Sequence, residues 1–327
     1  MKRISRSTLL LLCCFFGASI AFPAGFNKAG RTSFQFLKIG IGAQQTALGE
    51  ATIAYIRDVN TAFWNPAGIS GIQSTEASFS YARWFADMTY IAGAAGIRWR
   101  DVGVFAIGYS SLGYGAIPEA FATGSSSDTR TGSTFTGSDM MLSASFAHEF
   151  SEALSIGVTA KYVQEKLYTY STSLVAFDVG TYYDTGLKGI RFAMSFQNFG
   201  KSVKFLSMSD REEGYDIPLV YRVGTSVNII DGENGFINAG PDHRFVFCFE
   251  SVNSNDYGER WHIGGEYAFQ KFLFLRGGYR FNYDEGNLSL GIGLRQKVAD
   301  KDLRLDYAYV SYQYLESPHR ITLSVGF

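Results

Sequence analysis

The feature that most constrains this chain is an alternation of apolar and polar residues, in runs of about ten, that continues from about residue 74 to residue 327. The last run shows it plainly: Ile321, Leu323 and Val325 share one face, while Thr322 and Ser324 share the other. Side chains alternate between two faces along a β-strand, whereas a helix repeats every ~3.6 residues. The pattern therefore predicts an all-β protein.

Runs of this kind predict fourteen strands, near residues 74–83, 88–98, 103–112, 138–149, 154–168, 172–184, 189–199, 217–230, 242–252, 257–269, 271–283, 286–298, 302–313 and 317–327. An even number lets both ends of a bacterial outer-membrane barrel lie on the periplasmic side. Connections after odd-numbered strands then face outward and are the long ones. The two long polar segments, 113–137 and 200–216, both follow odd-numbered strands, although 231–241 is long for a periplasmic turn.

The two strand faces differ chemically, as a barrel with lipid outside and a polar lumen requires. One face is nearly all Leu, Ile, Val, Phe and Tyr. The polar residues predicted to face the lumen are Lys161, Asp178, Arg191, Arg222, Arg244, Glu250, His262, Glu266, Arg276, Arg280, Arg295, Arg304 and Asp306. A β-sandwich with a wet outer face would show a similar division. Aromatic residues near strand ends, such as Tyr81, Tyr90 and Trp99, favour the barrel because they are typical of interfacial girdles.

The start of the chain reads as an export signal. Basic residues precede an apolar run at 9–16, and small residues at 19–21 form a cleavage site. We therefore predict a signal peptide over residues 1–21 and export to the cell outer membrane. A lipoprotein signal is the alternative, but Cys13 and Cys14 lie inside the apolar run and do not follow the small residues that lipid attachment needs.

Composition narrows the class further. The chain has 28 Phe, 20 Tyr and 36 Gly but a net charge of only −1, so nothing in it favours a nucleic-acid partner. Beyond the signal, Cys248 is the single cysteine, which excludes a disulfide framework and a cysteine metal site. No later apolar stretch approaches the ~18 residues of a membrane helix. These features leave an exported β-protein or an outer-membrane barrel.

The stretch "NTAFWNPAGIS", residues 60–70, comes just before the first predicted strand. Proline fixes φ, asparagine can hydrogen-bond to its own backbone and glycine permits positive φ, so Asn65, Pro66, Ala67 and Gly68 predict a turn. Trp64 in front of this turn has the look of an exposed residue.

Residues 36–70, "FLKIGIGAQQTALGEATIAYIRDVNTAFWNPAGIS", resemble the N-terminal segment of the PorV/PorQ family of outer-membrane proteins, with its "ALGEA"-like run and its "WNPAG". Four further stretches match the family in order, at 176–186, 195–205, 264–281 and 305–327. Two positions depart from the family: Gln44 stands where many members carry Arg, and Asp58 is single where an acidic pair is common.

The resemblance implies a FadL-like barrel of fourteen strands whose N-terminal segment folds into the lumen as a plug. Residues 22–72 would form the plug and residues 73–327 the barrel. The plug turn would be Asn65, Pro66, Ala67 and Gly68, with inward charges anchoring the segment. The chain ends on Phe327, as many substrates of the outer-membrane assembly machinery do.

The resemblance also implies a function. PorV-like members work with the type IX secretion system, so the expected partners are translocon subunits and exported proteins bound at the extracellular loops, besides outer-membrane lipid. The alternative is a FadL-like channel for hydrophobic small molecules, with a pocket near the outer mouth and an opening in the wall. Glycines in "YIAGAAGI", residues 90–97, would mark either a strand kink at such an opening or, as we favour, room for the plug.

An enzyme is not expected. The chain has no Gly-x-Ser-x-Gly or His-Glu-x-x-His motif, and its four histidines show no ligand spacing. His262 and Glu266 share one strand face, but paired lumenal charges explain them more simply. "DGENG" at 231–235 lacks the ligand spacing of a calcium loop. No cofactor or metal is predicted.

Overall fold

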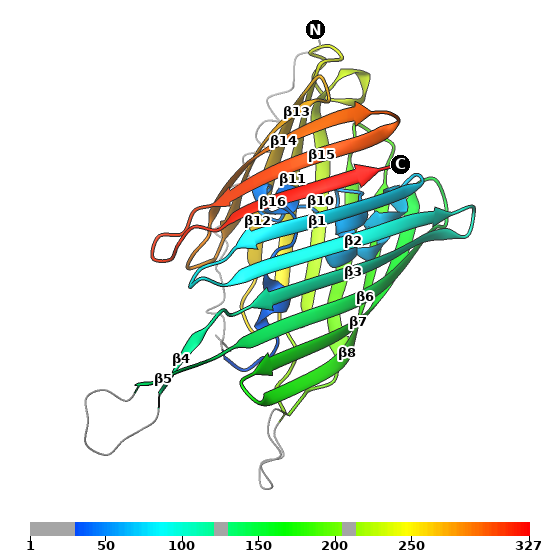
Figure 1. Cartoon of the computed structure of the whole chain (residues 1–327). Helices are drawn as coiled ribbons and strands as arrows, with labels where there is room; N and C mark the ends of the chain where they lie inside the picture. The colour runs from blue at the N-terminus through cyan, green and yellow to red at the C-terminus, as the bar shows by residue number, and fades with distance from the viewer. Residues whose placement is uncertain (1–29, 121–129, 205–213) are drawn as a thin grey trace.

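The computed structural model describes residues 30–120, 130–204 and 214–327, and the predicted signal peptide lies outside these ranges. The described residues form a closed barrel of fourteen antiparallel strands (Figure 1), in which β1 (Thr75–Arg83) pairs with β16 (His319–Gly326). The closed sheet confirms the all-β barrel and excludes the sandwich, because a barrel has no free edges.

The fourteen predicted strands correspond one to one with the observed ones. Between β1 and β16 the barrel strands are β2 (Thr89–Trp99), β3 (Gly103–Gly113), β6 (Gly137–Glu149), β7 (Leu154–Leu167), β8 (Tyr170–Asp184), β9 (Arg191–Gly200), β10 (Val220–Asp231), β11 (His243–Ser254), β12 (Arg260–Phe269), β13 (Leu273–Phe281), β14 (Leu288–Val298) and β15 (Lys301–Val310).

The sequence pattern missed a two-stranded sheet, β4 (Ile117–Ala120) with β5 (Arg130–Phe135), which lies in the connection between β3 and β6 and projects beyond the barrel (Figure 1). This connection and the one between β9 and β10 are at the same end, here called the long-loop end. The opposite end is the short-turn end. Its longest connection, between β10 and β11, contains the 3₁₀ helix η4 (Gly232–Asn234) and folds back through a bridge between Ile230 and Ile237.

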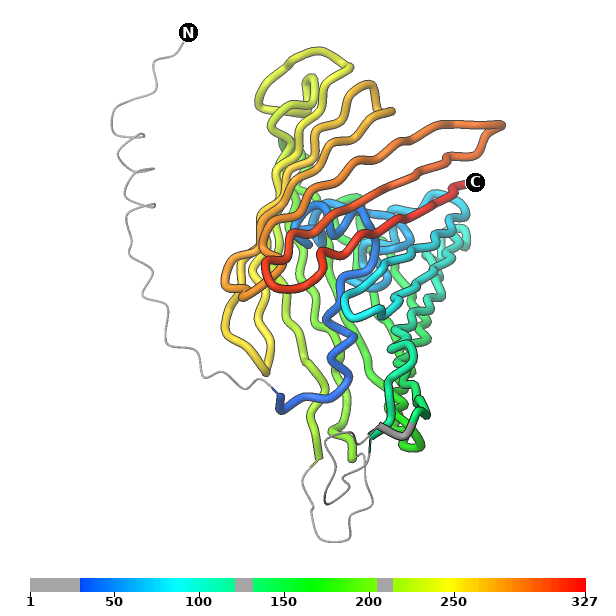
Figure 2. Tube along the Cα trace, turned by 60° about the vertical axis from the view of Figure 1, so that its left-hand side comes forward, coloured from blue at the N-terminus to red at the C-terminus, as the bar shows by residue number. Residues whose placement is uncertain are grey.

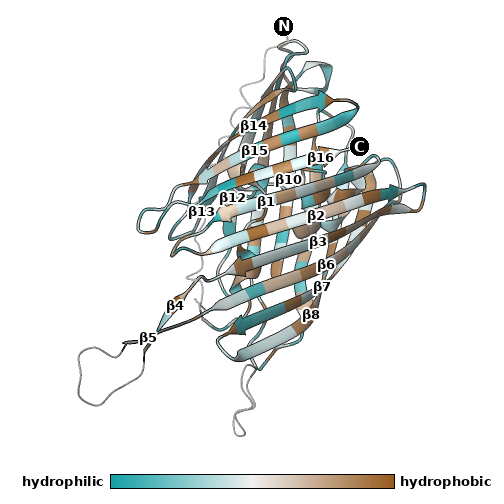
Figure 3. Cartoon of the chain, viewed as in Figure 1, coloured by the Kyte–Doolittle hydropathy of each residue, from teal (hydrophilic) through white to brown (hydrophobic). Residues whose placement is uncertain are grey.

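Apolar and polar residues alternate along the strands (Figure 3), and the apolar ones face outward: Phe79, Val175 and Leu323 are 55%, 54% and 54% exposed. The alternate residues are buried against the interior, for example Ser80 and Thr322. A transmembrane barrel needs this sorting, since lipid has no groups that could satisfy polar side chains. Tyr90 departs from its expected place in a girdle, because it is 4% exposed and faces inward. Among the described residues, no helix is long and apolar enough to cross a membrane.

Residues 30–72, here called the lumenal segment, run inside the barrel from the long-loop end (Figure 2, blue). The segment contains η1 (Gln35–Lys38), α2 (Ala43–Ala47), η2 (Val59–Phe63) and η3 (Pro66–Gly71). Helix α2 packs on β13 to β16, η2 on β1 to β3, and η3 on β3 and on β6 to β8. The interior of the barrel is therefore a packed core built largely from this segment.

Glycines in the wall let the segment approach its backbone. A Cβ on Gly157 would lie 2.4 Å from the carbonyl carbon of Pro66, and one on Gly278 would lie 2.2 Å from that of Leu48. A Cβ on Gly96 would lie 2.8 Å from the Cδ1 methyl group of the Ile72 side chain. Strand β2 pairs with both neighbours in continuous register. Of the two explanations for the glycines in residues 90–97, these observations favour the one in which glycine makes room for the segment, and not the one in which it kinks the strand.

Candidate functional site

The turn predicted at residues 65–68 caps a helix and also binds the barrel wall. The Asn65 side chain caps η3 by accepting from the Ala67 N–H at 3.1 Å, and its amide donates to the Thr181 carbonyl of β8 at 3.0 Å. Pro66 is at the first position of η3, where its missing N–H costs nothing. Ala67 and Gly68 follow in η3 and are buried. The turn thus joins the lumenal segment to the wall.

Trp64 is buried at 4% exposure, so the impression of an exposed residue was wrong. Its indole Nε1 donates to the Ile41 carbonyl at 2.9 Å, which ties two parts of the lumenal segment together. A buried indole N–H usually needs such a partner. Sequence alone could not show this because Ile41 is 23 residues away.

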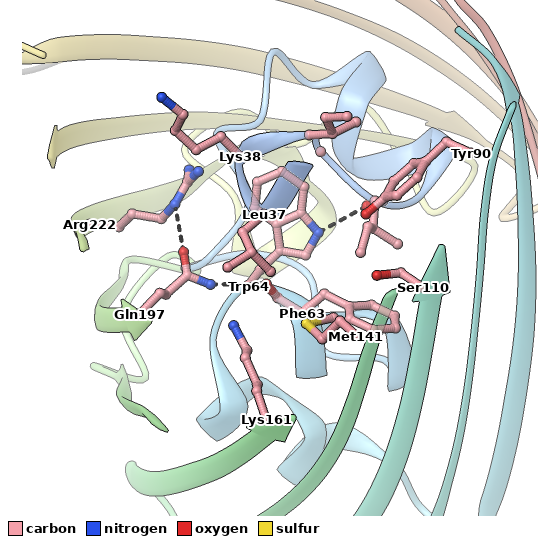
Figure 4. Close-up of a pocket in the computed structure, with 13 residues that line it drawn as sticks. Leu37, Lys38, Phe63, Trp64, Tyr90, Ser110, Met141, Lys161, Gln197 and Arg222 are labelled. Carbon is pink, nitrogen blue, oxygen red and sulfur yellow. Dashed lines mark hydrogen bonds between the residues drawn. The ribbon is translucent and has the colours of Figure 1, made fainter. Parts of the chain in front are cut away.

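Beside Trp64, a buried ion pair links the wall to the segment. Arg222 donates to Glu250 at 2.8 Å, and the same carboxylate accepts from the Thr52 N–H at 2.9 Å. The Arg222 guanidinium lies over the Trp64 ring, 4.9 Å from its centroid. Gln197 accepts from Arg222 and donates to the Phe63 carbonyl (Figure 4). Glu250 therefore binds the main chain of the segment directly, and Arg222 holds it through Gln197.

A second network lies toward the short-turn end. Arg276 pairs with Glu266 at 2.6 Å and with Asp306 at 2.5 Å. Glu266 also accepts from the Tyr55 hydroxyl and from the Gln44 amide. Gln44 thus contacts the same wall carboxylate as Tyr55.

Asp58 makes two contacts that fix η2. One carboxylate oxygen accepts from the Asn60 N–H at 2.9 Å and so caps the helix, while the other pairs with Arg304 of β15 at 3.1 Å. Arg304 also pairs with Glu76 of β1. Asp58 thus joins the segment to β15, and Arg304 extends the network to β1.

Lys161 and Asp178 form a buried pair at 2.6 Å in the wall itself. Both hold Asn198, which has a left-handed backbone (φ 62°) beside an irregularity in the pairing of β8 with β9. An asparagine tolerates this conformation better than most residues. The pair therefore stabilises a bulge and not the segment.

The thirteen polar residues predicted to face the lumen differ in exposure. Those that are buried are Lys161, Asp178, Arg222, Glu250, His262, Glu266, Arg276 and Asp306. Those that are half-buried are Arg191, Arg244, Arg280 and Arg304. The Arg295 side chain is 44% exposed at the short-turn end and pairs with Asp302. His262 and Glu266 have separate partners, since His262 bonds to the Tyr283 hydroxyl at 2.9 Å.

A cavity of about 180 Å³ opens at the long-loop end, between the lumenal segment and the wall. It is here called the outer cavity. Its lining combines aromatic rings with cationic side chains: Trp84, Tyr257, Tyr283 and Tyr312 with Lys38, Arg222, Arg260, Arg280 and Arg320. Leu37, Ile39 and Gly40 of the segment form its inner wall. Of these residues, only Arg222 and Arg280 were among the predicted lumenal sites.

The segment is tied down beside the outer cavity by Asp256. Its carboxylate pairs with Lys38 at 2.6 Å and accepts from the Thr32 hydroxyl at 2.9 Å. Burial raises the pKa of the Asp256 carboxyl, but hydrogen bonds from Lys38, Ser254 and Thr32 outweigh burial and hold the pKa below its ordinary value. The ionised carboxylate is thus the form that binds the segment.

Two other cavities border the segment. One of about 30 Å³ lies beside Trp64, between Leu37 and Met141 (Figure 4). Another of about 180 Å³ lies at the short-turn end, lined by Tyr55, Arg244 and Arg304 among others. Within the described residues, no group of three or more His, Cys, Asp or Glu side chains could hold a metal ion.

Comparison with known proteins shows which solved structures have a similar fold. No family model and no curated protein matches the chain. The toluene transporter TodX of Pseudomonas putida has a similar structure, with a TM-score of 0.58 at 11% sequence identity over 88% of this chain and 97% of TodX. The toluene transporter TbuX of Ralstonia pickettii gives 0.52, also at 11% identity, over 88% of this chain and 97% of TbuX. The barrel therefore shares the fold of these two transporters.

Proposed function

We propose that this protein is a FadL-like channel that carries small hydrophobic molecules across the outer membrane, without an enzymatic step. The outer cavity is the observation that carries the proposal. It presents four aromatic rings near Leu37 and Ile39, at the end of the barrel that carries the long connections. A concave site lined by aromatic and aliphatic side chains with a few fixed polar groups is what a small ligand needs. The shared fold with two toluene transporters supports the same function.

In this proposal the lumenal segment is both plug and gate. Residues 43–72 close the short-turn half of the lumen, held by Glu250, Glu266 and Arg304. Residues 30–42 border the outer cavity and are held mainly by Asp256 and by the Phe34 N–H bond to Glu165. A ligand that binds against Leu37 gains contacts with the weakly held part. Binding then shifts this part and opens the way past Trp64.

The test is a cavity-filling substitution. Leu37→Trp places a large ring where Leu37 lines both the outer cavity and the smaller cavity beside Trp64. Cells that express the wild-type barrel should accumulate labelled toluene faster than cells without it, and Leu37→Trp should reduce this gain at least fivefold. Leu290→Trp makes the same change on the lipid-facing wall, where Leu290 is 50% exposed, and should leave uptake unchanged. Equal uptake with and without the barrel would refute the channel.

A second candidate function is that of a PorV/PorQ-type partner in type IX secretion. The β4–β5 sheet favours it, because it projects beyond the barrel as a surface for a protein (Figure 1). The network of ion pairs that holds residues 43–72 also fits a barrel that stays sealed. Purification from the native outer membrane should then recover a translocon subunit, and removal of the sheet should abolish its recovery. Absence of type IX translocon genes from the genome would exclude this candidate.

A further inference from the structure

We propose that the outer cavity binds a small planar aromatic carboxylate, with the carboxylate on Arg320 and Arg260 and the ring among Trp84, Tyr283 and Tyr312. The inference rests on the proposed channel function and names the class of ligand. Three independent observations carry it: the charge of the lining, the unpaired guanidinium groups and the size of the cavity.

The lining has an excess of positive charge. Its charged side chains are Lys38, Arg222, Arg260, Arg280, Arg320, Glu50 and Glu285. Arg222, Arg280 and Lys38 are neutralised by Glu250, Glu50 and Asp256, at 2.8, 2.8 and 2.6 Å. Glu285 is engaged with the backbone N–H groups of residues 313 and 314. Two arginines remain, and they have no carboxylate partner among the described residues.

Of these two arginines, Arg320 gives the stronger evidence for an anionic ligand. It projects inward from β16, is 4% exposed, and its Nε has no hydrogen-bond partner in the described part of the chain. Its guanidinium lies over the Trp84 ring, with 5.0 Å from the guanidinium carbon to the ring centroid. The nearest compensating charge is Glu50, whose carboxylate is already paired with Arg280. A buried charge without a directly bonded counterion is costly, and arginine matches a carboxylate with two parallel bonds. An anionic ligand would supply the missing partner.

Arg260 is the second arginine that would bind the carboxylate of the ligand. Its guanidinium stacks on Tyr257 at 3.6 Å and on Tyr283 at 4.0 Å, and its Nε donates to the Asn282 carbonyl. Stacking fixes the plane of the guanidinium while it leaves the terminal N–H groups free of any carboxylate in the residues described. A planar aromatic ligand can stack on the guanidinium of an arginine and also on a tyrosine ring.

The size of the cavity selects a compact ligand. About 180 Å³ is close to the ~150 Å³ of an engineered protein cavity that holds benzene. A single ring with one carboxylate fits such a space, whereas most of a long acyl chain would extend beyond it. The aromatic lining from the loops at 84–88, 282–287 and 311–318 offers edges and faces to such a ring. Benzoate is therefore the simplest probe of this ligand class.

The experiment measures benzoate binding to the purified full-length protein in detergent by titration calorimetry. Wild type should bind benzoate at least tenfold more tightly than toluene or benzylamine, and more tightly than hexadecanoate. Arg320→Met should weaken benzoate binding at least tenfold, and Arg320→Lys should restore part of it. The control, Arg83→Met, removes an arginine that pairs with Asp87 outside the cavity and should change binding less than twofold.

The inference is overturned if wild type binds no benzoate, if Arg320→Met binds it as wild type does, or if hexadecanoate binds as tightly. Heat-modifiable mobility on gels shows for each variant that the barrel has folded, so a loss of binding is not a loss of protein. Uptake separates this inference from the channel. Toluene uptake without benzoate binding refutes the ligand class alone, and benzoate binding without any uptake refutes the channel alone.

Discussion

The two halves of the lumenal segment are held in different ways. Residues 43–72 lie against glycines of the wall so closely that Gly278 and Gly157 leave no room for a Cβ, and wall carboxylates such as Glu250 bind their main chain. Residues 30–42 have fewer anchors and border a cavity with two unpaired arginines. Both halves contribute to the core, since Phe34 and Phe36 are buried in it, but only the second half also borders the outer cavity. Closure and recognition therefore belong to different parts of one segment.

The largest effect is expected where the tight half meets the wall. Gly278→Ala would put a methyl group 2.1 Å from the Gly49 nitrogen, which backbone cannot accommodate without a shift. Overpacking costs about 1–3 kcal/mol, and a contact with rigid backbone places this variant at the upper end, so we expect a lower unfolding midpoint in detergent and a lower yield of folded barrel.

Its control is the adjacent Gly277→Ala, whose Cβ would meet only Leu290 at 3.6 Å and the Ser289 carbonyl at 4.0 Å. This variant should unfold like wild type. If both variants were equally stable, residues 43–72 would not be packed on the wall as described.

The next largest effect is expected at the buried pair of Arg222 with Glu250. Glu250→Gln keeps the shape of the side chain but leaves Arg222 as an uncompensated buried charge, which costs about 3 kcal/mol. The free energy of unfolding from urea titration should fall by this amount. The control is Glu149→Gln, which removes the ion pairs of an exposed carboxylate (39%) with Arg57 and Arg98. It should lower the free energy of unfolding by less than about 1 kcal/mol. Equal losses would mean that burial does not distinguish the two sites.

The smallest effect is expected in the weakly held half. Asp256→Asn removes the ion pair between this buried carboxylate and Lys38, whose side chain is 24% exposed, and should cost about 1.5 kcal/mol. Because folding lowers the pKa of Asp256, its contribution is present above the ordinary value and is lost as pH falls below about 4. Protease cleavage within residues 30–42 should therefore increase at low pH in wild type, with little further increase in Asp256→Asn. A pH response of the same size in both proteins would contradict this assignment.

The strands were predictable and the outer cavity was not, for physical reasons. Alternation along a strand is a local signal, so the barrel and the inward charges could be predicted from neighbouring residues. Arg320 carries the same signal, as it shares the polar face of the last strand with Thr322, yet nothing local shows that it lacks a partner. Tyr257 and Trp84 lie in loops without periodicity, and the barrel brings them together from positions 173 residues apart. The β4–β5 sheet was missed because its strands are short and separated by a long polar stretch.

Hydrogen–deuterium exchange with benzoate added to the full-length protein tests the division of the segment most directly. Amides of residues 43–72 are bonded within the segment and covered by the wall, so they should exchange slowly with or without benzoate. Amides of residues 33–41 should exchange faster, and benzoate should slow these alone. Equal exchange in both halves, or protection by benzoate only in residues 43–72, would contradict the account.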